Sequence, residues 1–207
     1  GALVNWFKEQ FGKVEEDLAE STDLSPFEVL DAQAAKIAPG SDGLLALPYF
    51  KGERSPIWDP KASGTLMGLS LYHTKPHVFR ALLESAAYSL RHNIDIGKKV
   101  GIPLKAETSV VGGVSKSDLW TQIIADVTGR EIVVPAGGVG APFGDALLAG
   151  VATGVIEDYS RVESWITRDK VFSPTEANTE IYDDYYELYL KLYEKSSSIM
   201  HELAELS

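Results

Sequence analysis

Two adjacent glycines, with the serines that follow them, are the residues of this sequence best suited to chemistry. Gly112 and Gly113 come after a strand-like run and precede a helical pattern that begins near Asp118. A strand that ends in glycines and turns into a helix brings unobstructed backbone N–H groups and the positive end of the helix to one point, which suits a phosphate. Ser115 and Ser117 lie where a helix N-cap is expected. The same glycines would also serve a plain tight turn.

Charged residues elsewhere in the sequence could act on a phosphate, bind a metal ion or serve structural roles. Arg54 could neutralise charge on a transferring phosphate, or it could form with Glu53 a structural ion pair that stiffens the long loop 51–63. Asp126 and Asp145 lie near helix ends and could hold a metal ion together. In the first turn of a helix, however, Asp145 would also complement the helix dipole. We assign no catalytic residue and no metal ligand to this chain.

Several further residues are expected to be structural. Trp58 and Trp120 could stack on a base, but core packing is the expected role of such large side chains. Asp59 stands before a proline and is expected to form a turn, and Glu84 is expected to hydrogen-bond within the domain. The histidines of the chain, 4 in number, show no metal-ligand spacing.

The hydrophobic pattern predicts the elements that must position these residues. Helices are predicted over 2–11, 25–38, 76–100, 117–128, 143–153 and 176–206, and strands over 44–50, 64–69, 107–111 and 131–134. Strands that alternate with helices after residue 100 imply an α/β sheet covered by helices. No stretch has the composition of a linker, so the pattern predicts one domain over 1–207.

Composition narrows the classes of function. The chain has 207 residues, of which 44% are hydrophobic, and a formal net charge of −11. A strongly acidic protein is a poor partner for nucleic acid or for an anionic membrane, because both are bound through basic patches. Backbone amides can still hold a nucleotide with Mg²⁺ in such a protein. The absence of cysteine fits a cytoplasmic location.

Four segments together resemble one family. The run Gly64-Thr65-Leu66-Met67-Gly68-Leu69, followed after 7 residues by residues 77–84, resembles the second signature of the FGGY carbohydrate kinases. The loop 52–60 looks like a conserved loop that these kinases carry at the same place. The turn and helix over 112–122 are similar to their adenosine site, and residues 140–146 resemble the entry into their next helix.

The resemblance implies a fold and a place within the family. It implies an α/β domain of the ribonuclease H-like, actin-like ATPase class, with a mixed sheet flanked by helices. Residues 1–207 look like the C-terminal, nucleotide-binding domain alone. The N-terminal domain, which in the family holds most of the sugar site and the aspartate that acts as general base, has no counterpart in the chain. The resemblance therefore implies ATP and Mg²⁺ as cofactors, with the base supplied from elsewhere.

The resemblance also implies a set of nucleotide-binding residues. These are Gly1, Asn5, Gly112, Gly113, Ser115 and Ser117. The glycine pair would pass close to the adenosine and the α-phosphate, and Ser117, or alternatively Ser115, would face the adenine. Gly1 and Asn5 match positions that contact the nucleotide phosphates in related kinases.

The implied reaction is ATP-dependent phosphorylation of a sugar hydroxyl. The loop 52–60 and the run 73–77 look most like xylulokinase-type members, whose substrate is a ketopentose such as D-xylulose. Members that act on gluconate or another sugar or polyol share much of this pattern. A non-enzymatic domain that senses nucleotide or docks partners is the alternative from another class. Family members are often dimers, so the resemblance allows a homodimer. The isolated chain is expected to be inactive, because the catalytic base is expected in the N-terminal domain.

Overall fold

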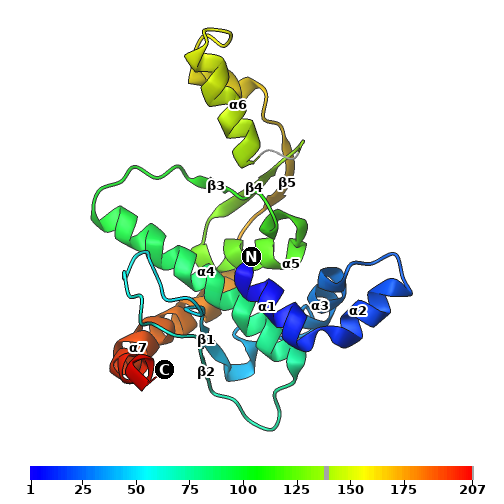
Figure 1. Cartoon of the computed structure of the whole chain (residues 1–207), viewed down its shortest axis with the longest axis vertical. Coiled ribbons are helices and arrows are strands. Elements are labelled where there is room, and N and C mark those ends of the chain that lie inside the picture. Colours follow the sequence, from blue (N-terminus) through cyan, green and yellow to red (C-terminus); the bar gives the residue numbers. More distant parts are fainter. Residues whose placement is uncertain (138–139, 207) are drawn as a thin grey trace.

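One long helix organises the molecule. The computed structural model describes residues 1–137 and 140–206, and in it α4 (Lys75–Lys99) crosses the centre and contacts α1, α3, α5 and β1 (Figure 1). The helix starts within one residue of the predicted position, because Pro76 fits its first turn and His77 Nδ1 accepts the Thr74 N–H at 3.1 Å. Its buried face includes Phe79, Leu82, Leu83, Ala87 and Tyr88.

The N-terminal helices α1 (Ala2–Phe11), α2 (Lys13–Glu20) and α3 (Pro26–Ala34) lie beside one end of α4 (Figure 1). Gly12 ends α1 as predicted, since a Cβ there would lie 2.5 Å from the Lys8 carbonyl oxygen. Helix α2 starts at the next residue and was not predicted. A capping box starts α3, with Ser25 Oγ accepting from the Glu28 N–H, but the helix ends at Ala34 and not at the predicted residue 38.

Two small sheets complete the α/β architecture. Strands β1 (Leu45–Leu47) and β2 (Thr65–Met67) pair antiparallel. In the second sheet β3 (Glu107–Ser109) is parallel to β4 (Glu131–Pro135), which is antiparallel to β5 (Arg168–Phe172). The second sheet is therefore mixed, as predicted. Strand β5 was missed because its exposed, charged residues lack the apolar alternation that signals a strand.

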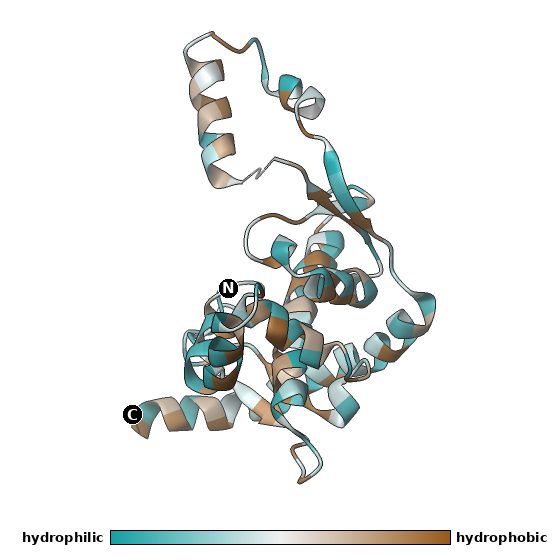
Figure 2. Cartoon of the chain, turned by 90° about the vertical axis from the view of Figure 1, so that its right-hand side faces the viewer, coloured by the Kyte–Doolittle hydropathy of each residue, from teal (hydrophilic) through white to brown (hydrophobic). Residues whose placement is uncertain are grey.

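The last two helices differ in how they are covered. Helix α7 (Glu176–Leu206) packs on α5 (Asp118–Thr128) and β1, and buries Tyr182, Tyr186, Tyr189 and Met200. Helix α6 (Ala141–Ala152) projects away from the body, although its sequence is largely apolar (Figures 1 and 2). Within the described part of the chain, α6 has no buried residue. None of the helices in that part is long and apolar enough to cross a membrane.

A left-handed turn joins the α3 region to β1. Gly40, Ser41, Asp42 and Gly43 all have positive φ, at 82°, 50°, 53° and 92°. Such a conformation is costly for residues with a Cβ, so it must be held by its surroundings. Glu84 holds it, because Oε1 accepts the Gly40 N–H at 3.0 Å and Oε2 accepts the Ser41 hydroxyl at 2.8 Å.

Glu84 also ties α4 to α7. Its Oε1 accepts from Arg80 Nε at 2.8 Å and from the Tyr182 hydroxyl at 2.8 Å. The side chains of this network, Ser41, Arg80, Glu84 and Tyr182, are all buried. Burial raises the pKa of Glu84, although Arg80, the Ser41 hydroxyl and Tyr182 favour its charged form. The prediction that Glu84 hydrogen-bonds within the domain is confirmed.

Candidate functional site

The double-glycine turn leaves open space beside the backbone. Gly112 has φ 81°, in the left-handed region, and Gly113 has helical angles. Among residues 1–137 and 140–206, and apart from the chain neighbours, no atom lies within 4 Å of a Cβ built on either glycine. The Ser115 hydroxyl closes the turn by donating to the Gly112 carbonyl at 2.8 Å. The turn is thus held by its own hydrogen bond, and its outer face is free.

The helix predicted over 117–128 is present as α5 (Asp118–Thr128), and it does not begin directly at the glycines. A single 3-10 turn, Val114–Lys116, separates Gly113 from α5. Helix α5 is capped by Ser117, whose Oγ accepts the Trp120 N–H at 3.0 Å. Ser117 therefore performs the capping role that its position predicts, a contribution of about 1 kcal/mol to helix stability. The positive end of α5 lies one turn beyond the glycines and not directly at them.

A cavity of about 710 Å³ brings distant segments of the chain to this turn. Its walls come from the start of α1, from α3, from α4 and from the segment between β3 and α5. Gly1, Asn5, Gly113 and Ser117 line it, together with apolar side chains that include Phe27, Phe79, Leu83 and Trp120. Its size is in the range of small-molecule and cofactor sites. Four of the residues predicted for nucleotide binding therefore face one space.

A second cavity, of about 450 Å³, lies against the other side of the turn. Gly112 and Ser115 line it, as do Gly140, Ala141 and Pro142 at the start of α6. Gly113 and Lys116 border both cavities. Each predicted binding residue thus lines at least one of the two.

Three charged residues that sequence reasoning did not assign to the site line the cavities, namely Glu28, Asp31 and Lys116. Lys116 borders both cavities, and Asp31 of α3 lines the larger one. Asp31 is partly buried, and burial raises the pKa of its carboxyl group, while the Ser117 hydroxyl lowers it. The spacing of the sequence gives no sign of Asp31, because it reaches the cavity only when α3 packs on α4. Lys116 could have been found from its place beside the glycines.

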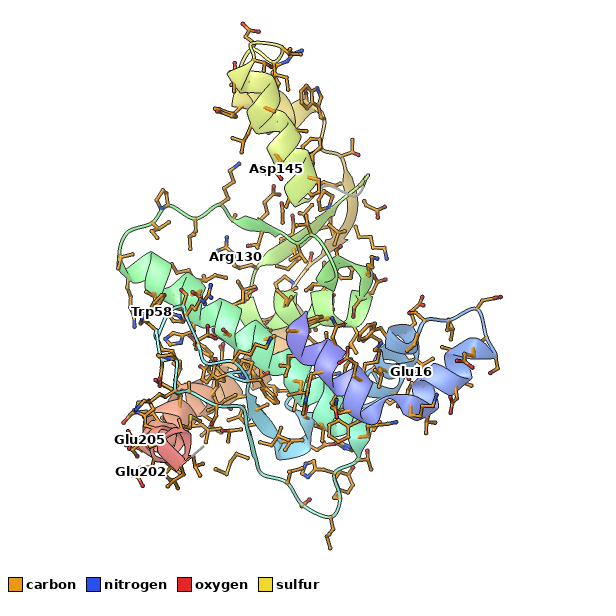
Figure 3. All side chains as sticks on the ribbon, in the orientation of Figure 1. Glu16, Trp58, Arg130, Asp145, Glu202 and Glu205 are labelled. Atoms are coloured by element: carbon orange, nitrogen blue, oxygen red, sulfur yellow. The ribbon has the colours of Figure 1, made fainter. Side chains whose placement is uncertain are left out.

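The two acids weighed as metal ligands lie on different helices, α5 and α6, and the prediction that Asp145 occupies the first turn of its helix is wrong, because α6 begins at Ala141. Asp126 is buried, and its carboxylate accepts from the Thr175 N–H and from Asn178 Nδ2, both at 2.8 Å, at the start of α7. Asp145 lies on the projecting α6 (Figure 3). Within residues 1–137 and 140–206, no group of three or more His, Asp or Glu residues is placed to hold a metal ion.

The loop 51–63 is fixed in place without the expected ion pair. Among the described residues, Glu53 does not pair with the Arg54 guanidinium; instead its Oε1 accepts the Arg54 N–H at 2.7 Å. Trp120 is in the core as predicted, but the same prediction for Trp58 is wrong. Trp58 is 75% exposed with φ 46°, and its side chain stands out from the loop (Figure 3).

Asp59 forms the predicted turn and anchors α7 as well. Its Oδ1 accepts the Lys61 N–H at 3.0 Å, which is the turn. Its Oδ2 lies 2.7 Å from the Tyr193 hydroxyl and 2.7 Å from His201 Nε2, both on α7. The loop 51–63 is therefore held against the C-terminal helix by a carboxylate.

Comparison with known proteins settles the family. A model of the FGGY family of carbohydrate kinases, C-terminal domain, matches residues 1–153. The chain belongs to the FGGY family. The predicted fold class, an actin-like ATPase domain with a mixed sheet flanked by helices, is confirmed by the solved structures of FGGY kinases that it matches. The extent of this domain from 153 to 207 stays a prediction.

Curated FGGY relatives act on different sugars. The chain is 32% identical to a gluconokinase of Bacillus licheniformis over 193 residues, covering 93% of this chain and 37% of that protein. It is 33% identical to a xylulose kinase of Staphylococcus epidermidis over 208 residues, covering 100% of this chain and 40% of that protein. The chain thus spans 37% to 40% of the length of these relatives.

Solved FGGY structures give the same picture. The xylulose kinase of Rhodospirillum rubrum superposes with a TM-score of 0.77 at 33% identity, over 97% of this chain and 39% of that one. The gluconate kinase of Lactobacillus acidophilus superposes with a TM-score of 0.79 at 27% identity, over 98% of this chain and 39% of that one. The fold is common to kinases of either name, so it does not distinguish their substrates.

Proposed function

We propose that this chain is the nucleotide-binding part of an ATP-dependent sugar kinase, whose acceptor is a ketopentose such as D-xylulose. The observation that carries the proposal is the cavity of about 710 Å³, which gathers Gly1, Asn5, Gly113 and Ser117 from separate segments. A Cβ on Gly113 would meet no protein atom within 4 Å. The glycine is therefore not required by packing, and its bare backbone fits a site that a ligand approaches closely.

Each part of the site has a separate task in this proposal. The N–H groups of the double-glycine turn and the Lys116 ammonium attract the phosphates. The apolar walls formed by Phe27, Phe79 and Leu83 hold the base, and Asn5 contributes a polar contact at the other wall. ATP supplies the phosphoryl group that the sugar hydroxyl receives, and Mg²⁺ accompanies the ATP phosphates. We place the general base and most sugar contacts in a domain outside this chain.

Gluconate is the second candidate substrate. The chain is 32% identical to the gluconokinase of Bacillus licheniformis and 33% identical to the xylulose kinase of Staphylococcus epidermidis, so the two sequence identities are nearly equal. Because the sugar contacts are proposed to lie mostly elsewhere, these similar identities leave both acceptors open. Phosphorylation assays of a full-length protein containing this chain, with D-xylulose and gluconate side by side, decide between them.

Titration calorimetry of the purified chain with Mg-ATP tests the nucleotide site. We expect the wild-type chain to bind, and Gly113→Leu to lose at least about tenfold in affinity, since the added side chain fills the cavity without straining the helical angles of residue 113. Gly144→Leu is the matched control. Gly144 also has no atom within 4 Å of a built Cβ, but it lies on α6 and lines neither cavity.

The outcomes separate the proposal from its rival. Binding that Gly113→Leu abolishes and Gly144→Leu preserves supports the nucleotide site. Equal binding by both variants would contradict it. A domain that only docks partners would bind no nucleotide at all, and a nucleotide sensor would bind ATP but give a full-length protein without sugar phosphorylation.

A further inference from the structure

The charged groups around the larger cavity are divided between its walls. Glu28 and Asp31 come from α3, and Lys116 lies beside Gly113 on the segment between β3 and α5. A triphosphate beside the α3 wall would face two carboxylates, and like charges at short range repel strongly where water is partly excluded. The phosphates therefore belong at the glycine and lysine wall. This orientation leaves the α3 wall for the base.

The two acids of that wall are not equivalent. Glu28 is already engaged, because its Oε2 accepts the Ser25 N–H at 2.7 Å and completes the capping box of α3. Asp31 is partly buried at the cavity wall, where the Ser117 hydroxyl favours its ionised carboxylate. A carboxylate offers about four lone-pair sites, so acceptor capacity remains.

Ser117, which was predicted to face the adenine, has most of its hydrogen-bonding capacity in use. Its oxygen accepts the Trp120 N–H at 3.0 Å, and its hydroxyl proton serves Asp31. A serine hydroxyl has a single proton to donate. Ser117 therefore positions the Asp31 carboxylate, and Asp31 is the group on this wall that is left to accept from a ligand.

We propose that Asp31 selects adenine by accepting a hydrogen bond from the exocyclic amino group of the base. The inference rests on the proposed nucleotide site and deepens it. Guanine and hypoxanthine carry an oxygen where adenine carries this amino group. That oxygen would face a carboxylate with no proton between them, and both groups would stay unpaired in a partly buried site. Unpaired polar groups of this kind are what make hydrogen-bonding sites selective.

The test compares Mg-ATP, Mg-GTP and Mg-ITP binding to the whole chain by calorimetry. We expect the wild type to prefer ATP over ITP and GTP by at least about tenfold. The adenine amino group donates to the Asp31 carboxylate, whereas the oxygen of guanine or hypoxanthine leaves that carboxylate unpaired. In Asp31→Asn the amide can accept from adenine or donate to the oxygen of the other bases. The preference should then fall to within about threefold.

Two controls keep the result specific. Glu28→Gln makes the same change of charge on the same wall and should leave the ATP preference intact. Asp31→Ala should weaken ATP binding and strengthen GTP binding, because the carboxylate that faces the guanine oxygen is removed, and circular dichroism checks that each variant is folded. The assignment of Asp31 is overturned if Asp31→Asn keeps the preference for ATP, or if Glu28→Gln loses that preference to the same extent. In either case, binding of ATP by the wild type still supports the nucleotide site. If the wild-type chain binds none of the three nucleotides, both the nucleotide site and the assignment of Asp31 are overturned.

Discussion

The glycines of this chain fall into two regions that use the missing side chain in opposite ways. A Cβ at Gly40, Gly64 or Gly68 would lie 2.3 Å from another atom of the protein, so the fold fills the space beside these residues. A Cβ at Gly112 or Gly113 would meet nothing within 4 Å. The first region needs glycine because the protein packs against it. The second keeps glycine beside an open cavity.

This difference bears on how the motifs are interpreted. The long signature over 64–84 carries the strongest likeness to the FGGY kinases, and in the structure its helical part, residues 77–84, is mostly buried. Gly68 meets the Gly43 carbonyl, and Glu84 holds the left-handed turn. The shorter motif at 112–117 borders the cavities. The long signature therefore serves mainly packing and adds Phe79 and Leu83 to the wall of the larger cavity, whereas the shorter motif forms the turn that borders both cavities.

The largest effect is expected from breaking the packed region at its centre. Glu84→Ala removes the acceptor for Gly40, Ser41 and Tyr182 and leaves the buried Arg80 without its carboxylate. Removing one partner of a buried ion pair costs about 3 to 5 kcal/mol. We expect a loss of that size in the free energy of unfolding, measured by urea denaturation of the chain.

Glu84→Gln is the control for this experiment. It keeps the shape and can still accept from Gly40 N–H, so it should lose less than Glu84→Ala. A loss below about 1 kcal/mol in Glu84→Ala would show that the turn does not depend on this carboxylate.

A matched pair of glycine variants tests the comparison directly. Gly68→Ala combines φ 95° with a contact to a backbone carbonyl that cannot move aside. We expect it to lower the free energy of unfolding by roughly 2 to 4 kcal/mol. Gly113→Ala has helical angles and open space, so its stability should stay within about 0.5 kcal/mol of the wild type. Similar losses in the two variants would erase the distinction between the regions.

The smallest effect concerns the carboxylate that ties the loop 51–63 to α7. Burial opposes ionisation of Asp59, but hydrogen bonds from His201, Tyr193 and the Lys61 N–H together lower its pKa below the ordinary 3.8. A carboxyl with a lowered pKa in the folded state stabilises the protein above its unfolded pKa, and this contribution is lost as pH falls through the folded pKa. Asp59→Asn should therefore cost about 1 kcal/mol at neutral pH.

Urea denaturation at two pH values checks this sign. The difference in unfolding free energy between wild type and Asp59→Asn should shrink from about pH 7 to about pH 3, where the wild-type carboxyl begins to take up its proton. If the difference in unfolding free energy is the same at both pH values, the ionised Asp59 carboxylate does not stabilise the contact between the loop 51–63 and α7.

Local signals in the sequence determined most helices and the family. The capping box at Ser25 and Glu28, the N-cap at Ser117 and the stop at Gly12 depend on residues within one turn of each other, so spacing alone reveals them. Strand β5 escaped prediction because pairing with β4, and not its own pattern, makes it a strand.

Only the tertiary structure decided what surrounds the candidate site. The sequence placed Gly112, Gly113 and Ser117 together, but the presence of Asp31 on the same cavity follows from the packing of α3, which no local spacing encodes. The same holds for Glu84, whose partners come from the segment at 40–41 and from α7. Contacts within a helical turn are fixed by sequence distance, whereas contacts between elements depend on how the whole chain buries its apolar faces.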